Sequence, residues 1–209
     1  MQEYITVLRE ARAEYTEKHS RFLAALTPCE SEEQAAALLR DVRSRYWDAK
    51  HHCYAYSLAD GTRRFSDDGE PHGTAGKPIL EVLEGSGLTN VLLVVTRYFG
   101  GVLLGTGGLV RAYSKAAKDA VNAAERAKMT PCTVLRTRCP YADHDRLIKL
   151  IEAAGGVPEN TEFADEVTLI YHLQSGAVPD FLDRLCEGFA AKITAEPVAE
   201  TLCPVKIFD

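Results

Sequence analysis

A run of five glycines between an apolar segment and a helix-like segment constrains the fold of this chain more than any other feature. The run lies in RYFGGVLLGTGGLVRAY, residues 97–113. The preceding segment LTNVLLVVTRYF is continuously apolar and predicts a buried central strand. The residues that follow predict a helix to about Ala127, with an inward face of Val110, Tyr113, Ala117, Val121 and Ala124. Glycines at such a strand–helix turn indicate a backbone that comes unusually close to another group.

Two phosphate-binding motifs are near matches to this stretch. Gly100 and Gly105 have the spacing of the motif GxxxxGK[ST], but Thr106 occupies the position of the lysine that neutralises the phosphates. In the dinucleotide motif GxGxxG, Gly105 and Gly107 fit, whereas Val110 replaces the third glycine. The sequence therefore satisfies neither motif.

The start of the predicted helix is nevertheless a candidate site for an anion. Unpaired N–H groups and the helix dipole favour negative charge there, and Arg111, Lys115 and Lys118 follow on one face at i, i+4 and i+7. The alternative is that the glycines serve close packing and positive φ angles, while the basic residues form a solvated face. The candidate binding residues of this segment are Arg97, Tyr98, Gly100, Gly101, Gly105, Gly107, Gly108, Arg111, Lys115 and Lys118.

The loop SDDGEPHG, residues 66–73, is a second candidate site. Its polar side chains are Asp67, Asp68, Glu70 and His72. Carboxylates with an imidazole are suited to a divalent ion or to acid–base work, but Asp and Gly also form tight hydrogen-bonded turns. Because no second cluster of ligands occurs elsewhere, we assign neither a metal nor a catalytic residue. The four side chains and Lys77, at the start of the next predicted helix, join the candidate binding set.

The other segments before residue 128 also mix strands and helices. Residues 2–28 contain two or three β-rich segments, and SEEQ at 31–34 is a capping box that predicts a helix start at Ser31. KHHCYAYSL at 50–58 alternates in polarity and predicts a strand. Residues 63–78 predict a loop by composition, and a helix follows to Glu84.

Charge divides the chain into two parts. Residues 1–128 hold 17 basic and 17 acidic side chains, whereas residues 129–209 hold 7 and 13 and so carry the whole net charge of −6. This balance argues against a protein that coats nucleic acid, and we expect domains at 1–128 and 129–209. The second part predicts a ferredoxin-like βαββαβ domain, with elements at 132–139, 143–154, 157–163, 167–173, 179–189 and 191–196.

The six cysteines and the hydropathy of the chain bear on its compartment. No CxxC pair occurs, and a chain of 209 residues needs no disulfide framework. The longest aliphatic run, Val91 to Val95, is too short to span a bilayer, and the first residues lack the layout of a secretory signal. These features predict a cytoplasmic protein with reduced thiols and no membrane contact.

Three segments together resemble the IMPACT/YigZ family: KHHCYAYSL, RFSDDGEPHGTAGKPIL and NVLLVVTRYFGGVLLGTGGLVRAY. The resemblance implies an α+β chain. Its first domain would have the fold of a small-subunit ribosomal protein and of domain IV of elongation factor G, and its second would be ferredoxin-like. Eukaryotic members of that family are translation regulators that act by protein–protein contact, and bacterial members have no agreed enzymatic activity.

We therefore expect a translation-associated binding protein that contacts RNA or a ribosome-linked protein through the glycine-rich, basic face of its first domain. This function requires no cofactor and no catalysis. The alternative is a small-molecule enzyme, or a phosphate or nucleotide binder, that uses the glycine turn and the acidic loop. A third hypothesis makes the glycines architectural and places the binding face elsewhere.

Overall fold

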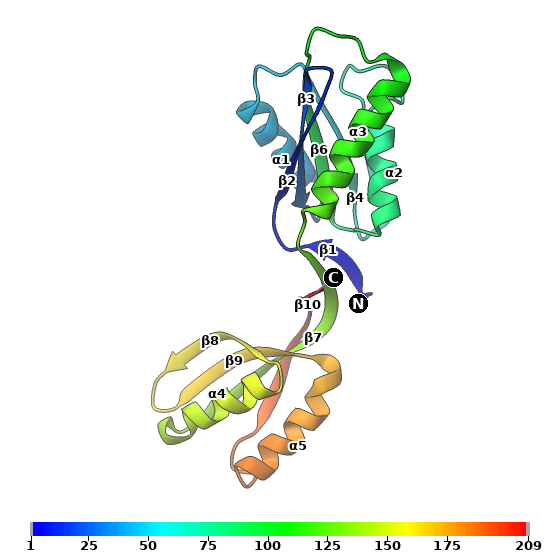
Figure 1. Ribbon diagram of the computed structural model, residues 1–209. Helices are drawn as coiled ribbons and strands as arrows, with labels where there is room; N and C mark the ends of the chain where they lie inside the picture. The colour runs from blue at the N-terminus through cyan, green and yellow to red at the C-terminus, as the bar shows by residue number, and fades with distance from the viewer. Residues whose placement is uncertain (1, 208–209) are drawn as a thin grey trace. The chain divides into compact units, whose positions relative to one another are not determined.

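The computed structural model describes residues 2–207, which form two compact units (Figure 1). The N-terminal unit contains Tyr4–Lys128 and the C-terminal unit contains Met129–Val205. Each unit combines a sheet with helices, which confirms the predicted α+β class. Within the described residues, no helix combines the length and apolar character that a membrane crossing needs.

The N-terminal unit is built on an antiparallel sheet with the strand order β2-β3-β6-β4-β5. The strands are β2 (Ala11–Glu17), β3 (Ser20–Pro28), β4 (His51–Ser57), β5 (Arg63–Ser66) and β6 (Val91–Tyr98). β6 is central, and seven of its eight residues are buried. The continuous apolar run therefore marks the central strand, as the sequence predicts.

Three helices cover the two faces of this sheet: α1 (Glu32–Arg45), α2 (Gly76–Ser86) and α3 (Gly105–Asn122). α2 and α3 pack on one face, where Phe22, Val95, Ile79 and Tyr113 belong to one core cluster, and α1 packs on the other (Figure 1). The Ser31 hydroxyl accepts from the Gln34 N–H, which confirms the predicted cap. The Gln34 side chain accepts from the Glu30 N–H, one residue before the partner that a capping box uses.

The strand register brings several loops to one end of the sheet. Tyr98, the last residue of β6, lies opposite Arg21 of β3, and Arg97 lies opposite His51 of β4. The β2–β3 turn, the segment before β4, the segment after β5 and the glycine turn after β6 therefore share this end. We call it the loop end; its segments are residues 18–19, 46–50, 67–75 and 99–104.

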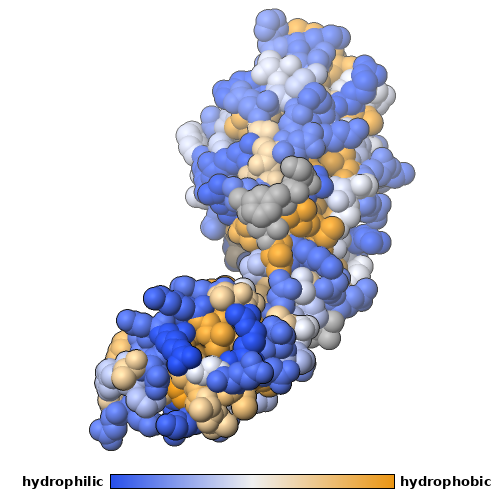
Figure 2. All heavy atoms as spheres, turned by 60° about the horizontal axis from the view of Figure 1, so that its bottom comes forward, coloured by the Kyte–Doolittle hydropathy of each residue, from blue (hydrophilic) through white to orange (hydrophobic). Residues whose placement is uncertain are grey.

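The C-terminal unit follows the predicted order of strand, helix, two strands, helix and strand. Its elements are β7 (Arg126–Cys139), α4 (His144–Ala153), β8 (Val157–Phe163), β9 (Val167–Gln174), α5 (Val178–Gly188) and β10 (Ala195–Lys206), with 3₁₀ turns at Tyr141–Asp143 and Ser175–Ala177. In its sheet β8 pairs with β9, β9 with β7, and β7 with β10. The short strand β1 (Tyr4–Val7) belongs to the N-terminal unit. Hydrophilic residues make up most of the visible surface of both units (Figure 2).

Several predicted boundaries are wrong. The predicted loop 63–78 contains the strand β5 and the first residues of α2, and the strand predicted at 132–139 begins at Arg126. α3 ends at Asn122 rather than near Ala127, because β7 begins at Arg126 and takes these residues into a sheet. The last strand covers Ala195–Lys206 rather than 191–196, since the chain before it is still turning after α5. The errors at the end of α3 and at β10 lie where sheet pairing with distant residues overrides local sequence preference.

Candidate functional site

The first glycine of the turn lies against the backbone of the same chain. A Cβ on Gly100 would stand 2.1 Å from the carbonyl carbon of His19, in the β2–β3 turn. The Gly100 N–H donates to the Ser20 hydroxyl at 3.1 Å, which holds the two turns together. The close approach that this glycine permits is therefore internal, and it is a feature of packing.

The later glycines face solvent. Gly101 and Gly105 adopt φ angles of +83° and +70°, and a Cβ on either would meet open space. Gly105 and Gly107 are exposed in the first turn of α3, and Leu104, at the N-cap, supplies no side-chain hydrogen bond. Leu104 thus leaves the first N–H groups of α3 without a side-chain cap.

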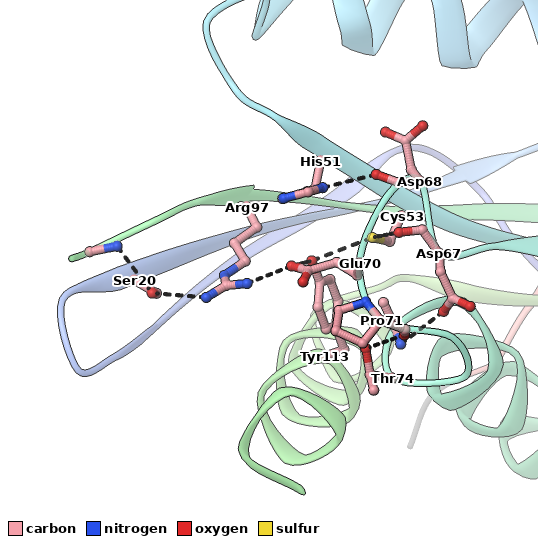
Figure 3. A network of polar contacts seen from close by, with 12 residues as sticks. Ser20, His51, Cys53, Asp67, Asp68, Glu70, Pro71, Thr74, Arg97 and Tyr113 are labelled. Carbon is pink, nitrogen blue, oxygen red and sulfur yellow. Dashed lines mark hydrogen bonds and ion pairs between the residues drawn. The ribbon is translucent and has the colours of Figure 1, made fainter. Parts of the chain in front are cut away.

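Arg97 is buried, so the expectation that it forms part of an exposed basic face is wrong. Its side chain is 7% exposed, and its Nη1 donates to Glu70 at 2.6 Å (Figure 3). Nη2 donates to the Ser20 hydroxyl at 3.4 Å, and the guanidinium lies 5.5 Å from the ring centre of Phe22 and 5.6 Å from that of Phe99. The strand pleat explains this position, because the odd-numbered residues of β6 point to the face that α2 and α3 cover.

Glu70 connects the acidic loop to the core of the N-terminal unit. Its Oε1 accepts from Arg97 and, at 2.8 Å, from the Tyr113 hydroxyl of α3 (Figure 3). The Cys53 thiol donates to the Tyr113 hydroxyl at 3.4 Å. Burial raises the pKa of Tyr113 strongly and that of Cys53 to about 12, so both groups remain protonated at neutral pH. This network is structural, and Glu70 is not available to a ligand.

Asp67 and Asp68 also act inside the fold. The Asp67 carboxylate accepts from the N–H groups of Gly73, Ala75 and Gly76 at 2.8–3.0 Å and thereby caps α2. Asp68 accepts from Arg43 at 2.7 Å and from the His52 N–H at 2.7 Å. The loop is therefore a hydrogen-bonded turn, the predicted alternative to a metal or acid–base site.

His72 and Lys77 remain at the surface beside this turn. The His72 side chain is 99% exposed, and its nearest carboxylate, that of Asp67, lies 3.9 Å away. Lys77 is exposed in the first turn of α2. Within residues 2–207, no group of three or more His, Cys, Asp or Glu side chains has the arrangement of a metal site.

The three basic residues of α3 have different surroundings in the structure. Arg111 is exposed, and its Nη1 lies 3.5 Å from the Cβ position of Gly107. Lys115 pairs with Asp119 at 2.6 Å, and Lys118 lines a groove of about 430 Å³ between α2 and α3. Of the three predicted cations, Arg111 is therefore the one beside the glycine turn. The binding roles of the three remain predictions.

Tyr98, a predicted binding residue, is only partly accessible. Its hydroxyl donates to Asp48 at 2.8 Å, and the guanidinium of Arg21 lies 6.0 Å from its ring centre. The residue is half-buried. Both the polar tip and the aromatic ring thus have contacts within the protein.

Sequence reasoning missed the exposed apolar side chains of the loop end. Leu103 is 83% exposed, Phe99 55%, Val102 44% and Trp47 82%. Val110, which the periodicity assigns to the inward face of α3, is 36% exposed. The sequence did contain one signal for this exposure. The apolar residues between the glycines do not continue the strand pattern before them or the helix pattern after them, so they are not needed for the buried core.

Two family models match this chain. The model described as the Impact N-terminal domain matches residues 18–121, and the one described as a domain of unknown function (DUF1949) matches residues 137–192. The first match contains the loop end, α2 and α3. The second lies within the C-terminal unit.

Several known proteins are similar to this chain, two of them along most of its length. The Escherichia coli (strain K12) protein named IMPACT family member YigZ is 38% identical over 174 residues, which cover 81% of this chain and 85% of that protein. A crystal structure of a hypothetical protein aligns with a TM-score of 0.62 at 32% identity, covering 95% of this chain and 98% of that one. Protein IMPACT from Oryctolagus cuniculus is 35% identical over 95 residues, which cover 43% of this chain and 30% of that protein.

Proposed function

This chain belongs to the IMPACT family, and from that premise we propose that it is a translation-associated binding protein. Its contact with RNA or a ribosome-linked protein is made through the loop end of the N-terminal unit and the first turns of α3. The eukaryotic members of the family, as translation regulators, give the precedent for such a role. The proposal needs no cofactor and no catalytic residue.

One observation carries this proposal: exposed apolar side chains gather at the loop end, close to an exposed cation that has no ion pair among the described residues. Leu103 and Phe99 project from the glycine turn, and Arg111 follows in α3. Exposed apolar patches of this kind mark interaction surfaces in soluble proteins. Glycines with positive φ angles on either side of Val102 and Leu103 present these side chains outward at little steric cost.

The domain assignment is part of the proposal. The N-terminal unit has the fold type of the small-subunit ribosomal protein and of domain IV of elongation factor G, and the C-terminal unit is ferredoxin-like. The order β10-β7-β9-β8, with α4 and α5 packed against one core cluster, supports the second assignment. The antiparallel five-stranded sheet with helices on both faces is compatible with the first.

The enzymatic alternative receives no support from the geometry. Glu70 is bound to Arg97 and Tyr113, and Asp67 caps a helix. A general acid or base must reach the proton that it transfers, and these carboxylates are directed at internal donors. His72 stands apart from the buried network, with its side chain in solvent.

Co-sedimentation with ribosomal subunits at two salt concentrations tests the proposal. The wild-type protein is expected to sediment with a subunit or with the 70S ribosome at about 0.1 M salt, and Arg111→Glu to weaken this association by about tenfold. Arg40→Glu, an exposed change in the middle of α1, is the matched control and is expected to bind as the wild type does. Failure of the wild-type protein to sediment with any ribosomal fraction would remove the proposal.

A further inference from the structure

We propose that the loop end docks on a protein surface, with Leu103 and Trp47 as its two apolar anchors, and that the partner offers apolar pockets with an acidic rim. The inference rests on the proposed function, because the partner is sought on the ribosome. The inference specifies that the partner is a protein. It also adds Trp47, which lies outside the glycine turn, to the proposed binding surface.

The two anchors come from different loops at the same end of the sheet. Trp47 lies between α1 and β4, and Leu103 lies between β6 and α3. Because His51 at the start of β4 pairs with Arg97 near the end of β6, both loops leave the sheet at its loop end. The side chains of Trp47 and Leu103 are 82% and 83% exposed.

This exposure is not explained by the fold. Most apolar residues in the other segments of the N-terminal unit are buried in two clusters, one on each face of its sheet; Leu8, Phe65 and Val110 are exposed, but less than Trp47 and Leu103. Side chains as large as tryptophan and leucine gain most from burial, and Trp is among the commonest hot-spot residues of protein interfaces. The loop end thus keeps apolar surface that association with a partner would remove from water.

The charges at the loop end favour an acidic rim on the partner. Residues 97–118 contain no Asp or Glu, and the first acidic residue after them, Asp119, is paired with Lys115. The Asp68 carboxylate is paired with Arg43, whereas exposed Asp48 accepts only from the neutral Tyr98 hydroxyl and keeps its charge. In the described part of the chain, Lys18 and Lys50 of the loop end and Arg111 of α3 are exposed cations without an ion pair.

Nucleic acid fits this surface less well than protein does. Single-stranded RNA is held by aromatic rings that stack on bases and by a basic groove along the backbone. Phe99 already stacks on the Arg97 guanidinium, and Tyr98 is engaged by Asp48 and Arg21. Leu103 and Val102 are aliphatic and offer no stacking face. Trp47 alone among these loop-end side chains is a free aromatic platform.

The test compares two purified probes, 70S ribosomes and deproteinised ribosomal RNA, each at about 0.1 M and about 0.5 M KCl. The wild-type protein is expected to bind ribosomes at both salt concentrations, since apolar contacts are not screened, and to bind the naked RNA at least tenfold more weakly. Leu103→Ser and Trp47→Ser are each expected to weaken ribosome binding by about tenfold or more. Their melting temperatures should stay at the wild-type value, because both side chains are exposed.

Leu8→Ser is the matched control. Leu8 is 38% exposed and precedes β2, whose first residue lies at the opposite end of the sheet from the loop end. Ribosome binding that survives both anchor changes would overturn the inference and leave the proposed function standing. The inference would also fail, and the proposed function stand, if the protein bound naked RNA as tightly as ribosomes and if that binding were lost at high salt and in Arg111→Glu but not in the anchor variants. Absence of wild-type binding to both probes would overturn the inference and the proposed function together.

Discussion

The Arg97 guanidinium donates to the Glu70 carboxylate at 2.6 Å, and both side chains are more than nine-tenths buried. This contact joins the end of β6 to the acidic loop, and Tyr113 of α3 donates to the same carboxylate oxygen. Two motifs that look like separate binding sites in the sequence are therefore partners in one internal network. What remains for recognition is the surface around that network.

Glu70→Gln should destabilise the N-terminal unit severely. The change leaves the Arg97 charge buried without its counter-charge, which costs about 3–5 kcal/mol in comparable buried pairs. The loss is expected in the free energy of unfolding from urea titration. Asp119→Asn, which removes the exposed pair with Lys115, should change that free energy by about 0.5 kcal/mol or less. Equal effects of the two changes would contradict the assigned role of Glu70.

Asp67→Asn should lower stability and alter its dependence on pH. Burial raises the pKa of Asp67, but the N–H donors of Gly73, Gly76 and Ala75 together outweigh it and hold the pKa below its usual value. The stabilisation is therefore present above the ordinary aspartate pKa of about 3.9 and is lost as the pH falls through the lower folded value. The variant should lose about 1–2 kcal/mol at pH 7.

The dependence of the unfolding free energy on pH tests whether the Asp67 cap requires the negative charge of the side chain. Between about pH 5 and about pH 2, the Asp67→Asn protein should lose less stability than the wild type, because one carboxylate that titrates on unfolding is gone. Asp41→Asn, an exposed change in α1, is the control and should keep the wild-type profile. Parallel profiles for Asp67→Asn and the wild type would show that the cap does not depend on the charge.

Gly100→Ala and Gly85→Ala should change stability in opposite directions. A Cβ on Gly100 would overlap the His19 backbone, and relief of that overlap should cost about 1–3 kcal/mol. Gly85 lies in α2 with open space around its Cβ position, so alanine should stabilise the helix by about 0.5–1 kcal/mol. Thermal unfolding of the two variants gives the comparison, and a neutral Gly100→Ala would mean that the two turns do not touch in solution.

Cys186 should be the first cysteine to react with thiol reagents. All six cysteines lie within the described residues, and Cys186 is exposed whereas the other five are buried. Burial raises the pKa values of Cys53 and Cys203 to about 12, so their thiolate forms are scarce at pH 8. Mass spectrometry after brief alkylation of the native protein should find a single label at Cys186. Early labelling of Cys53 would mean that the core around Tyr113 opens readily.

Short-range sequence patterns were enough to predict strands and helices whose buried residues form a continuous run or recur at a regular spacing. The apolar run of β6, the cap at Ser31 and the alternation of β4 each depend on neighbours in the sequence, and each is found in the structure. The end of α3 and the extent of β10 depend on which strand pairs with which. That choice is made by residues far along the chain, so local propensity could not place them.

The sequence by itself determined the α+β class, the order of most elements and the position of the glycine turn, because hydrophobic periodicity and capping act over a few residues. Tertiary structure alone decided what the charged residues do. Arg97 meets Glu70, 27 positions away, only when β6 and the acidic loop are packed together, and this pairing removes it from the surface. Leu103 and Trp47 come to the same end of the sheet by strand register, a relation between segments that no local pattern encodes.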